Sequence, residues 1–99
     1  MNLDSLRGLC QSGAIIVSQH CMKRMIERGI GLAEVKQTIM CGEIIEDYPE
    51  DFPYPSALIL GGGLHVVAGA GDGRLWLITA YRPSLDQWEA DLKTRRAGK

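Results

Sequence analysis

The order of apolar and polar residues divides the chain into a helical first part and a second part made of strands. Residues 2–11, 19–28 and 32–41 carry apolar side chains at the three- and four-residue spacing of an amphipathic helix, and a glycine follows each run. The short run Ile15–Val17 reads as extended, and Ser18 is a residue type that caps helix N-termini well. The first part of the chain is therefore predicted to be a small group of short helices.

From Gly42 onward, apolar and β-branched runs alternate with turn residues. This pattern predicts four strands, with a proline-rich loop after the first and glycine turns between the others; their ranges are 43–47, 56–60, 64–70 and 75–82. Ser84 followed by Gln87 has the form of a capping box and predicts a final helix that buries Trp88. The expected fold class is α+β in a single domain over residues 1–99, with N-terminal helices packed on a four-stranded antiparallel sheet and a C-terminal helix.

Composition and charge narrow the class of protein. The formal net charge is −1 and the pI is about 6.1, so no global positive field attracts nucleic acid. The three cysteines form no C-x-x-C motif, no secretory signal follows Met1, and no apolar run is long enough to span a membrane, which together predict a reduced, cytoplasmic protein. The spacing of His20, Cys21, Cys41 and His65 matches no zinc pattern, so we expect no metal and no cofactor.

The predicted helix over residues 19–28 holds the most informative chemistry. His20, Arg24 and Arg28 are spaced by four residues and form a ridge along the polar side of this helix. An imidazole transfers a proton near neutral pH, and a guanidinium holds a phosphate through two parallel hydrogen bonds. The ridge therefore fits phosphodiester chemistry. The alternative is a plain solvated helix face.

The last predicted strand is the second candidate region. Strict alternation along residues 75–82 places Thr79 and Tyr81 on one face together with Leu77, and large apolar groups on the other. This pattern predicts one open face and one core face, and His65 on the neighbouring strand would join the open face. The alternative for His65 is a cross-strand histidine whose ring is satisfied by a local hydrogen bond.

Two segments together resemble a known family. The segment 18–30 contains the pattern His-x-x-x-Arg-x-x-x-Arg-Gly-Ile, and the segment 78–83 contains Thr-x-Tyr-Arg-Pro. With these segments the chain resembles the family called domain of unknown function 4258, over roughly residues 15–92. The resemblance implies a small toxin-like fold similar to the RelE and MqsR-type messenger-RNA interferases. Such proteins are often encoded beside an antitoxin, commonly one with a small zinc-finger module.

The resemblance also implies which positions carry function. The implied catalytic residues are His20, Arg28 and Tyr81, and the implied substrate-binding residues are Arg24, His65, Thr79 and Arg82. The leading hypothesis is a metal-independent endoribonuclease, the toxin of a type II toxin–antitoxin pair, with RNA as its substrate and a cognate antitoxin as its partner. In that hypothesis His20 transfers a proton and the arginines stabilise the pentacovalent phosphate.

A non-catalytic module is the alternative function. A toxin relative without activity could serve as an oligomeric or partner-binding protein, with the acidic stretch Glu43–Asp51 and its proline-rich loop as the contact surface. The slightly negative net charge disfavours strong binding of free RNA and keeps this alternative open.

Overall fold

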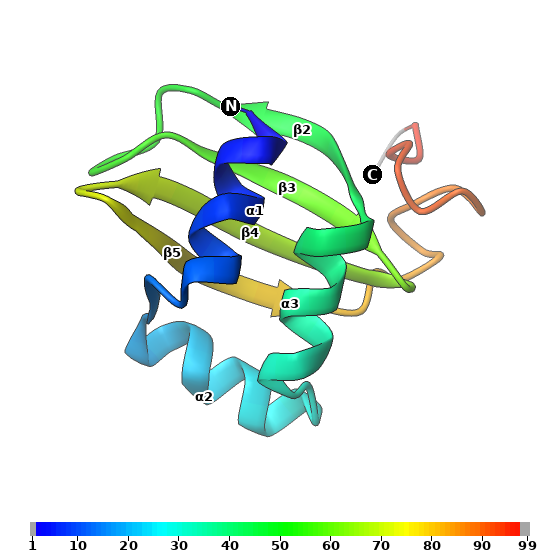
Figure 1. The fold of residues 1–99 in the computed structure, drawn as a ribbon. Helices are drawn as coiled ribbons and strands as arrows, with labels where there is room; N and C mark the ends of the chain where they lie inside the picture. The colour runs from blue at the N-terminus through cyan, green and yellow to red at the C-terminus, as the bar shows by residue number, and fades with distance from the viewer. Residues whose placement is uncertain (1, 98–99) are drawn as a thin grey trace.

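The computed structural model describes residues 2–97 and contains three helices and a five-stranded sheet (Figure 1). The elements, in chain order, are α1 (Leu3–Ser12), β1 (Ile15–Val17), α2 (Gln19–Arg28), α3 (Leu32–Cys41), β2 (Glu43–Tyr48), β3 (Ser56–Gly61), β4 (Leu64–Gly71) and β5 (Arg74–Tyr81). The helices therefore occupy the predicted segments. None of the described helices is long and apolar enough to cross a membrane.

The sheet differs from the predicted one in its strand number and its direction. Its order is β1-β5-β4-β3-β2, with β1 parallel to β5 and the other neighbours antiparallel. The prediction of a four-stranded, wholly antiparallel sheet is therefore wrong. The sequence predicts only an extended run at Ile15–Val17, but this run pairs with the edge of β5. Backbone bonds at both of its ends fix the pairing, from Leu75 N–H to Ala14 C=O at 2.7 Å and from Ser18 N–H to Leu77 C=O at 3.3 Å.

Local capping explains where the helices begin and end. The Ser18 hydroxyl accepts a hydrogen bond from the Cys21 N–H at 3.0 Å, and Gly29 ends α2 in the left-handed region at φ 65°. Gly42 follows α3 with an extended backbone, and glycine is needed there because a Cβ would lie 2.4 Å from two backbone oxygens. The Arg7 guanidinium, from α1, donates to the Ile39 and Gly42 carbonyls, and so satisfies groups that the end of α3 leaves free.

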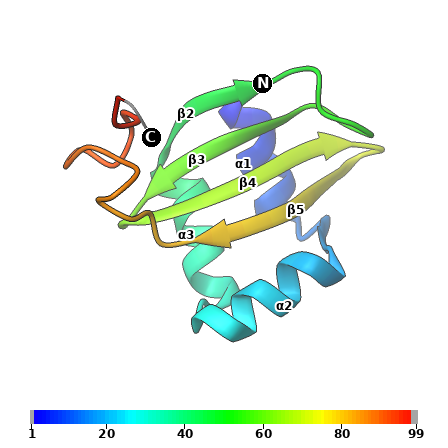
Figure 2. The same cartoon turned by 180° about the vertical axis from the view of Figure 1, so that it is seen from behind.

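Two of the helices, α1 and α3, form a layer against one face of the sheet. Figure 1 shows α1 and α3 lying across that face, whereas α2 runs beside β5 at the sheet edge. The core between the layers joins Leu6, Val35 and Ile39 of the helices to Val66 and Leu77 of the sheet. We refer to the opposite side of the sheet, seen in Figure 2, as the far face.

One extra residue in β5 changes which side chains reach the far face. Val67 pairs with Thr79 but the next residue, Ala68, pairs with Leu77, so Ile78 has no partner in β4 and forms a β-bulge. Leu77 therefore faces the core, and Thr79 faces the far side. The expectation that Leu77 shares a face with Thr79 and Tyr81 is wrong, because strict alternation holds only where the pairing is unbroken.

The predicted C-terminal helix is absent. Residues 82–97, which we call the strap, follow an irregular path onto the far face at the end of the sheet where β5 finishes (Figure 2). The capping serine forms a single turn, in which Gln87 and Trp88 N–H groups both donate to the Ser84 carbonyl. The chain then reverses at Asp91, whose carboxylate accepts hydrogen bonds from residues 93 and 94. This local competition for backbone groups ends the helix after one turn.

Trp88 is the hydrophobic anchor of the strap. Its side chain is 2% exposed, and residue 88 forms an isolated bridge with Arg95. The indole therefore takes over the burial that a C-terminal helix was expected to provide.

The anchor role predicts a large and local loss of stability on truncation. Trp88→Ala should lower the free energy of unfolding by about 3–5 kcal/mol, because it removes a buried ring and leaves a cavity. The matched control is Leu85→Ala, whose side chain is 58% exposed in the same segment and whose loss should change stability by less than about 0.5 kcal/mol. Urea unfolding monitored by circular dichroism measures both. Equal effects of the two substitutions would contradict the assignment of Trp88 as the anchor.

Candidate functional site

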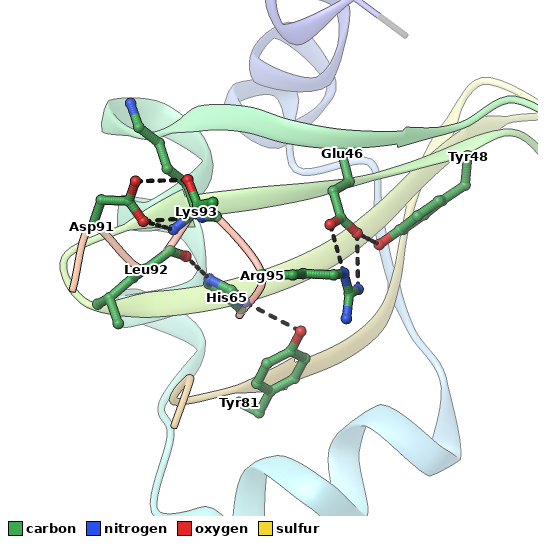
Figure 3. Close-up of polar contacts among 9 residues, drawn as sticks. Glu46, Tyr48, His65, Tyr81, Asp91, Leu92, Lys93 and Arg95 are labelled. Carbon is green, nitrogen blue, oxygen red and sulfur yellow. Dashed lines mark hydrogen bonds and ion pairs between the residues drawn. The ribbon is translucent and has the colours of Figure 1, made fainter. Parts of the chain in front are cut away.

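A fully buried histidine lies at the centre of the polar contacts on the far face. His65 of β4 pairs with Tyr81 of β5, and its Nδ1 lies 3.2 Å from the Tyr81 hydroxyl (Figure 3). Its Nε2 lies 2.6 Å from the Leu92 carbonyl oxygen. A carbonyl oxygen can only accept, so Nε2 carries the proton and the neutral ring accepts the Tyr81 O–H bond at Nδ1. The sequence predicted an open face here, but the strap covers His65 completely.

Burial acts on the acid–base properties of this pair. Loss of solvent lowers the pKa of His65, and this effect outweighs the hydrogen bond to Leu92 that favours the charged ring. Burial also raises the pKa of the Tyr81 hydroxyl. Both groups are therefore neutral near pH 7, as the tautomer argument requires.

The strap is held against this pair by aromatic and charged contacts. The Trp88 ring meets the His65 ring edge to face at 4.6 Å between centroids, and the Arg95 guanidinium lies 4.6 Å from the centre of the Trp88 ring. Arg95 also donates two hydrogen bonds to the Glu46 carboxylate of β2, at 2.8 and 2.9 Å (Figure 3). The strap is thus clamped to two strands of the sheet.

The same carboxylate links the strap to a second tyrosine. The Tyr48 hydroxyl donates to Glu46 at 2.6 Å, and burial together with this carboxylate raises the pKa of Tyr48 to about 12. Residue 92 has φ 61°, in the left-handed region that side chains disfavour, and it is this residue whose carbonyl meets His65. The surrounding contacts therefore hold the strap in a strained shape around the histidine.

A second group of predicted residues meets at the end of β5. Arg28, Tyr81 and Arg82 line an open hollow of about 460 Å³. Beyond the short strand β1, none of the described strands pairs with this edge of β5, and Arg28 Nη1 donates to the Ala80 carbonyl there at 2.8 Å. Arg82 forms an exposed ion pair with Glu34 at 3.2 Å. Each guanidinium has five N–H donors, so both arginines keep donors available for an anion in the hollow.

The other predicted residues do not reach this hollow. His20 is exposed in the first turn of α2 and forms no hydrogen bond or ion pair with the described residues. Eight residues of helix separate it from Arg28, which is about 12 Å along the axis. Arg24 lies between them and pairs with Glu27 at 3.0 Å. Thr79 is half-buried on the far face opposite Val67. The ridge of α2 therefore brings only its last member to the end of β5.

Several residues of the site had little or no signal in the sequence. Glu46 and Arg95 are 49 positions apart, and no local pattern predicts their pairing. Trp88 was expected to be buried, but in a helix and not against His65. Within residues 2–97 no cluster of three or more histidine, cysteine or carboxylate side chains is arranged to hold a metal ion. Cys10 and Cys21 are buried free thiols and Cys41 is an exposed one.

Comparison with known proteins identifies the family. The family model described as domain of unknown function DUF4258 matches residues 17–82 of this chain. The chain belongs to this family. The match runs from the end of β1 to the first residue after β5, so it includes α2, His65 and Tyr81 and leaves most of the strap outside. No curated protein and no solved structure matches the chain significantly.

The buried neutral ring of His65 predicts a pH-dependent stability. In the unfolded DUF4258 chain this histidine has an ordinary pKa of about 6.5, and in the folded chain its pKa is lowered. Between the two values the unfolded state binds more protons, so the free energy of unfolding must fall as the pH falls through about 6.5. Urea unfolding between about pH 7.5 and 5 measures this slope. Three carboxylates whose pKa values are lowered by hydrogen bonds change the stability only at lower pH; they are Glu34, Glu46 and Asp91.

The two histidines of the chain control for each other. His65→Gln should abolish the slope near pH 6, whereas His20→Gln should leave it unchanged, because His20 is exposed and has no hydrogen bond or ion pair with residues 2–97. A slope that disappears with His20→Gln and persists with His65→Gln would refute the assignment.

Proposed function

We propose that this protein is a metal-independent endoribonuclease, acting as the toxin of a type II toxin–antitoxin pair. The observation that supports this function is the hollow in which Arg28, Tyr81 and Arg82 come together. The DUF4258 resemblance, which implies a fold similar to the RelE and MqsR-type interferases, motivates RNA as the substrate and a cognate antitoxin as the partner. A cytoplasmic location is part of the same proposal.

In this proposal the scissile phosphate lies in the hollow between the two arginines. Cleavage forms a bond between the ribose 2′-oxygen and phosphorus, the 2′-hydroxyl proton passing to solvent water. It breaks the bond to the 5′-oxygen, leaving a 2′,3′-cyclic phosphate and a 5′-hydroxyl. Negative charge grows on the phosphate oxygens in the transition state. Two guanidinium groups with free N–H donors, already fixed by Ala80 and Glu34, stabilise that charge without further reorganisation.

Tyr81 has the proton-transfer role closest to the phosphate. Its raised pKa keeps the hydroxyl protonated near pH 7, so it can give its proton to the leaving 5′-oxygen. In the free protein the Tyr81 O–H points to His65 Nδ1, which fixes the position of the phenol. In the cleavage step the O–H turns to the leaving 5′-oxygen, and solvent returns a proton to the phenolate afterwards. His65 is therefore proposed as a positioning residue, and Tyr81 and Arg28 as catalytic residues.

His20 and Arg24 receive a different place in this proposal. Because α2 runs beside β5 and His20 lies about 12 Å from Arg28, a strand of RNA held in the hollow would meet them at a neighbouring nucleotide. They would extend the binding surface along the helix. Thr79, half-buried on the far face, would contribute at its margin.

Cleavage of a labelled single-stranded RNA in the presence of EDTA tests the function. The wild-type protein should produce fragments ending in cyclic phosphate, and Tyr81→Phe and Arg28→Ala should each lower the rate by about 100-fold or more. Lys23→Ala is the matched control, since it removes a cation from the same helix outside the hollow and should cleave at the wild-type rate. Two further measurements separate lost catalysis from loss of the Arg28 bond to the Ala80 carbonyl. They are the cleavage rate of Arg28→Lys, which keeps the positive charge, and the unfolding curve of every variant.

Two results would reject the proposal. If the folded wild-type protein binds RNA or a partner but cuts no RNA, the protein is a non-catalytic module. If RNA is cut and Tyr81→Phe and Arg28→Ala cut it normally, the active site lies elsewhere.

A further inference from the structure

An apolar cleft lies on the far face, at the end of the sheet opposite the strap. Figure 2 shows the loop between β2 and β3 at that end, close to the β4–β5 turn. The cleft has a volume of about 440 Å³. Its main walls come from the loop and from β5: Asp51, Phe52, Pro53, Tyr54, Trp76 and Ile78.

The walls of the cleft are fixed before anything binds. The Trp76 indole donates to the Gly71 carbonyl at 2.9 Å, and its ring lies 5.5 Å from the Tyr54 ring between centroids. Gly71 has to be glycine here, because a Cβ would lie 2.0 Å from the Tyr54 ring. The Ser56 hydroxyl bonds to the Asp51 carboxylate and holds the loop to β3. A preorganised surface loses little freedom when a ligand binds.

The rim of the cleft exposes a large apolar side chain. Phe52 is 95% exposed, and Ile78 is 38% exposed. A small molecule within the cleft would leave Phe52 in water, so burial of this ring needs a surface that reaches over the rim. Exposed apolar groups around a formed cleft are typical of protein-binding sites.

The charges near the cleft indicate the chemistry of the partner. Of the five carboxylates between residues 43 and 51, Glu43 and Glu46 are paired with Lys93 and Arg95 of the strap. In the part of the chain that the structure describes, Glu50 and Asp51 form no ion pair. Asp51 lines the cleft and Glu50 precedes it in the loop, so these two carboxylates attract a cationic segment and repel an acidic one.

We propose that this cleft is a docking site for a partner-protein segment that carries a bulky apolar residue flanked by lysine or arginine. The apolar residue enters between Tyr54, Trp76 and Ile78, the segment covers Phe52, and the flanking cations pair with Glu50 and Asp51. The cleft uses no residue of the Arg28 hollow, so this inference does not depend on the nuclease activity.

A nuclear magnetic resonance titration with three synthetic peptides tests the proposal. The probe is a six-residue peptide with a Leu-Phe centre between pairs of lysines; one comparison peptide has glutamates in place of the lysines, and the other has serines in place of the apolar centre. The lysine-flanked Leu-Phe peptide alone should shift the Trp76 indole N–H resonance with saturation. Phe52→Ser and Glu50→Lys should each weaken its binding about tenfold.

The matched control is Leu85→Ser, which removes another exposed apolar side chain on the strap, outside the cleft, and should bind like the wild type. The proposal is overturned if no peptide shifts the indole resonance, if the glutamate-flanked peptide binds equally well, or if Phe52→Ser has no effect.

Association of the protein with itself would give a different occupant. The exposed Met22 and Ile26 of α2, beside Lys23, could meet the cleft of a second copy. Sedimentation that shows an oligomer dissolved by both Met22→Ser and Phe52→Ser would assign the cleft to a second copy and overturn the partner proposal. A monomer that binds the lysine-flanked peptide supports it.

Discussion

The extra residue Ile78 in β5 is the constraint on which the functional region depends. Upstream of it, Leu75 and Leu77 face the helices, and downstream of it Ala80 does, so the alternation of faces shifts once within the strand. Without that shift, Tyr81 would face the core and could not meet His65. The same strand then presents the Ala80 carbonyl at the open edge, where Arg28 binds it. One inserted residue thereby aligns both halves of the site.

A second requirement follows from the burial of His65. A buried imidazole needs a partner for each nitrogen, and the sheet provides only Tyr81. The other partner is the Leu92 carbonyl of the strap, which reaches it in a strained backbone conformation with Trp88 packed alongside. The strap is therefore integral to the fold of this DUF4258 protein even though most of it lies outside the family match.

The sequence predicted the parts of this structure that depend on local signals. Helix α2 begins after Ser18 and ends at Gly29, as predicted, because a capping hydroxyl and a left-handed glycine act within a few residues. The capping box at Ser84 failed for the opposite reason, since Asp91 and Trp88 find better partners than a helix would give them. The parallel pairing of β1 with β5, and the bond between Arg95 and Glu46, join segments far apart in sequence, and hydrophobic periodicity contains no information about either. The three residues that meet in the hollow, Arg28, Tyr81 and Arg82, were all candidates from the sequence. Only the fold shows that they lie together.

The position of the strap along the chain has a consequence for biosynthesis. All five strands precede it, so the residues that cover His65 are synthesised after the whole sheet. Until the strap is added, His65 Nε2 lacks its hydrogen-bond acceptor at Leu92, and the His65 ring lacks its contact with the Trp88 indole. The partner of His65 Nε2 is thus made later than every strand against which the imidazole packs.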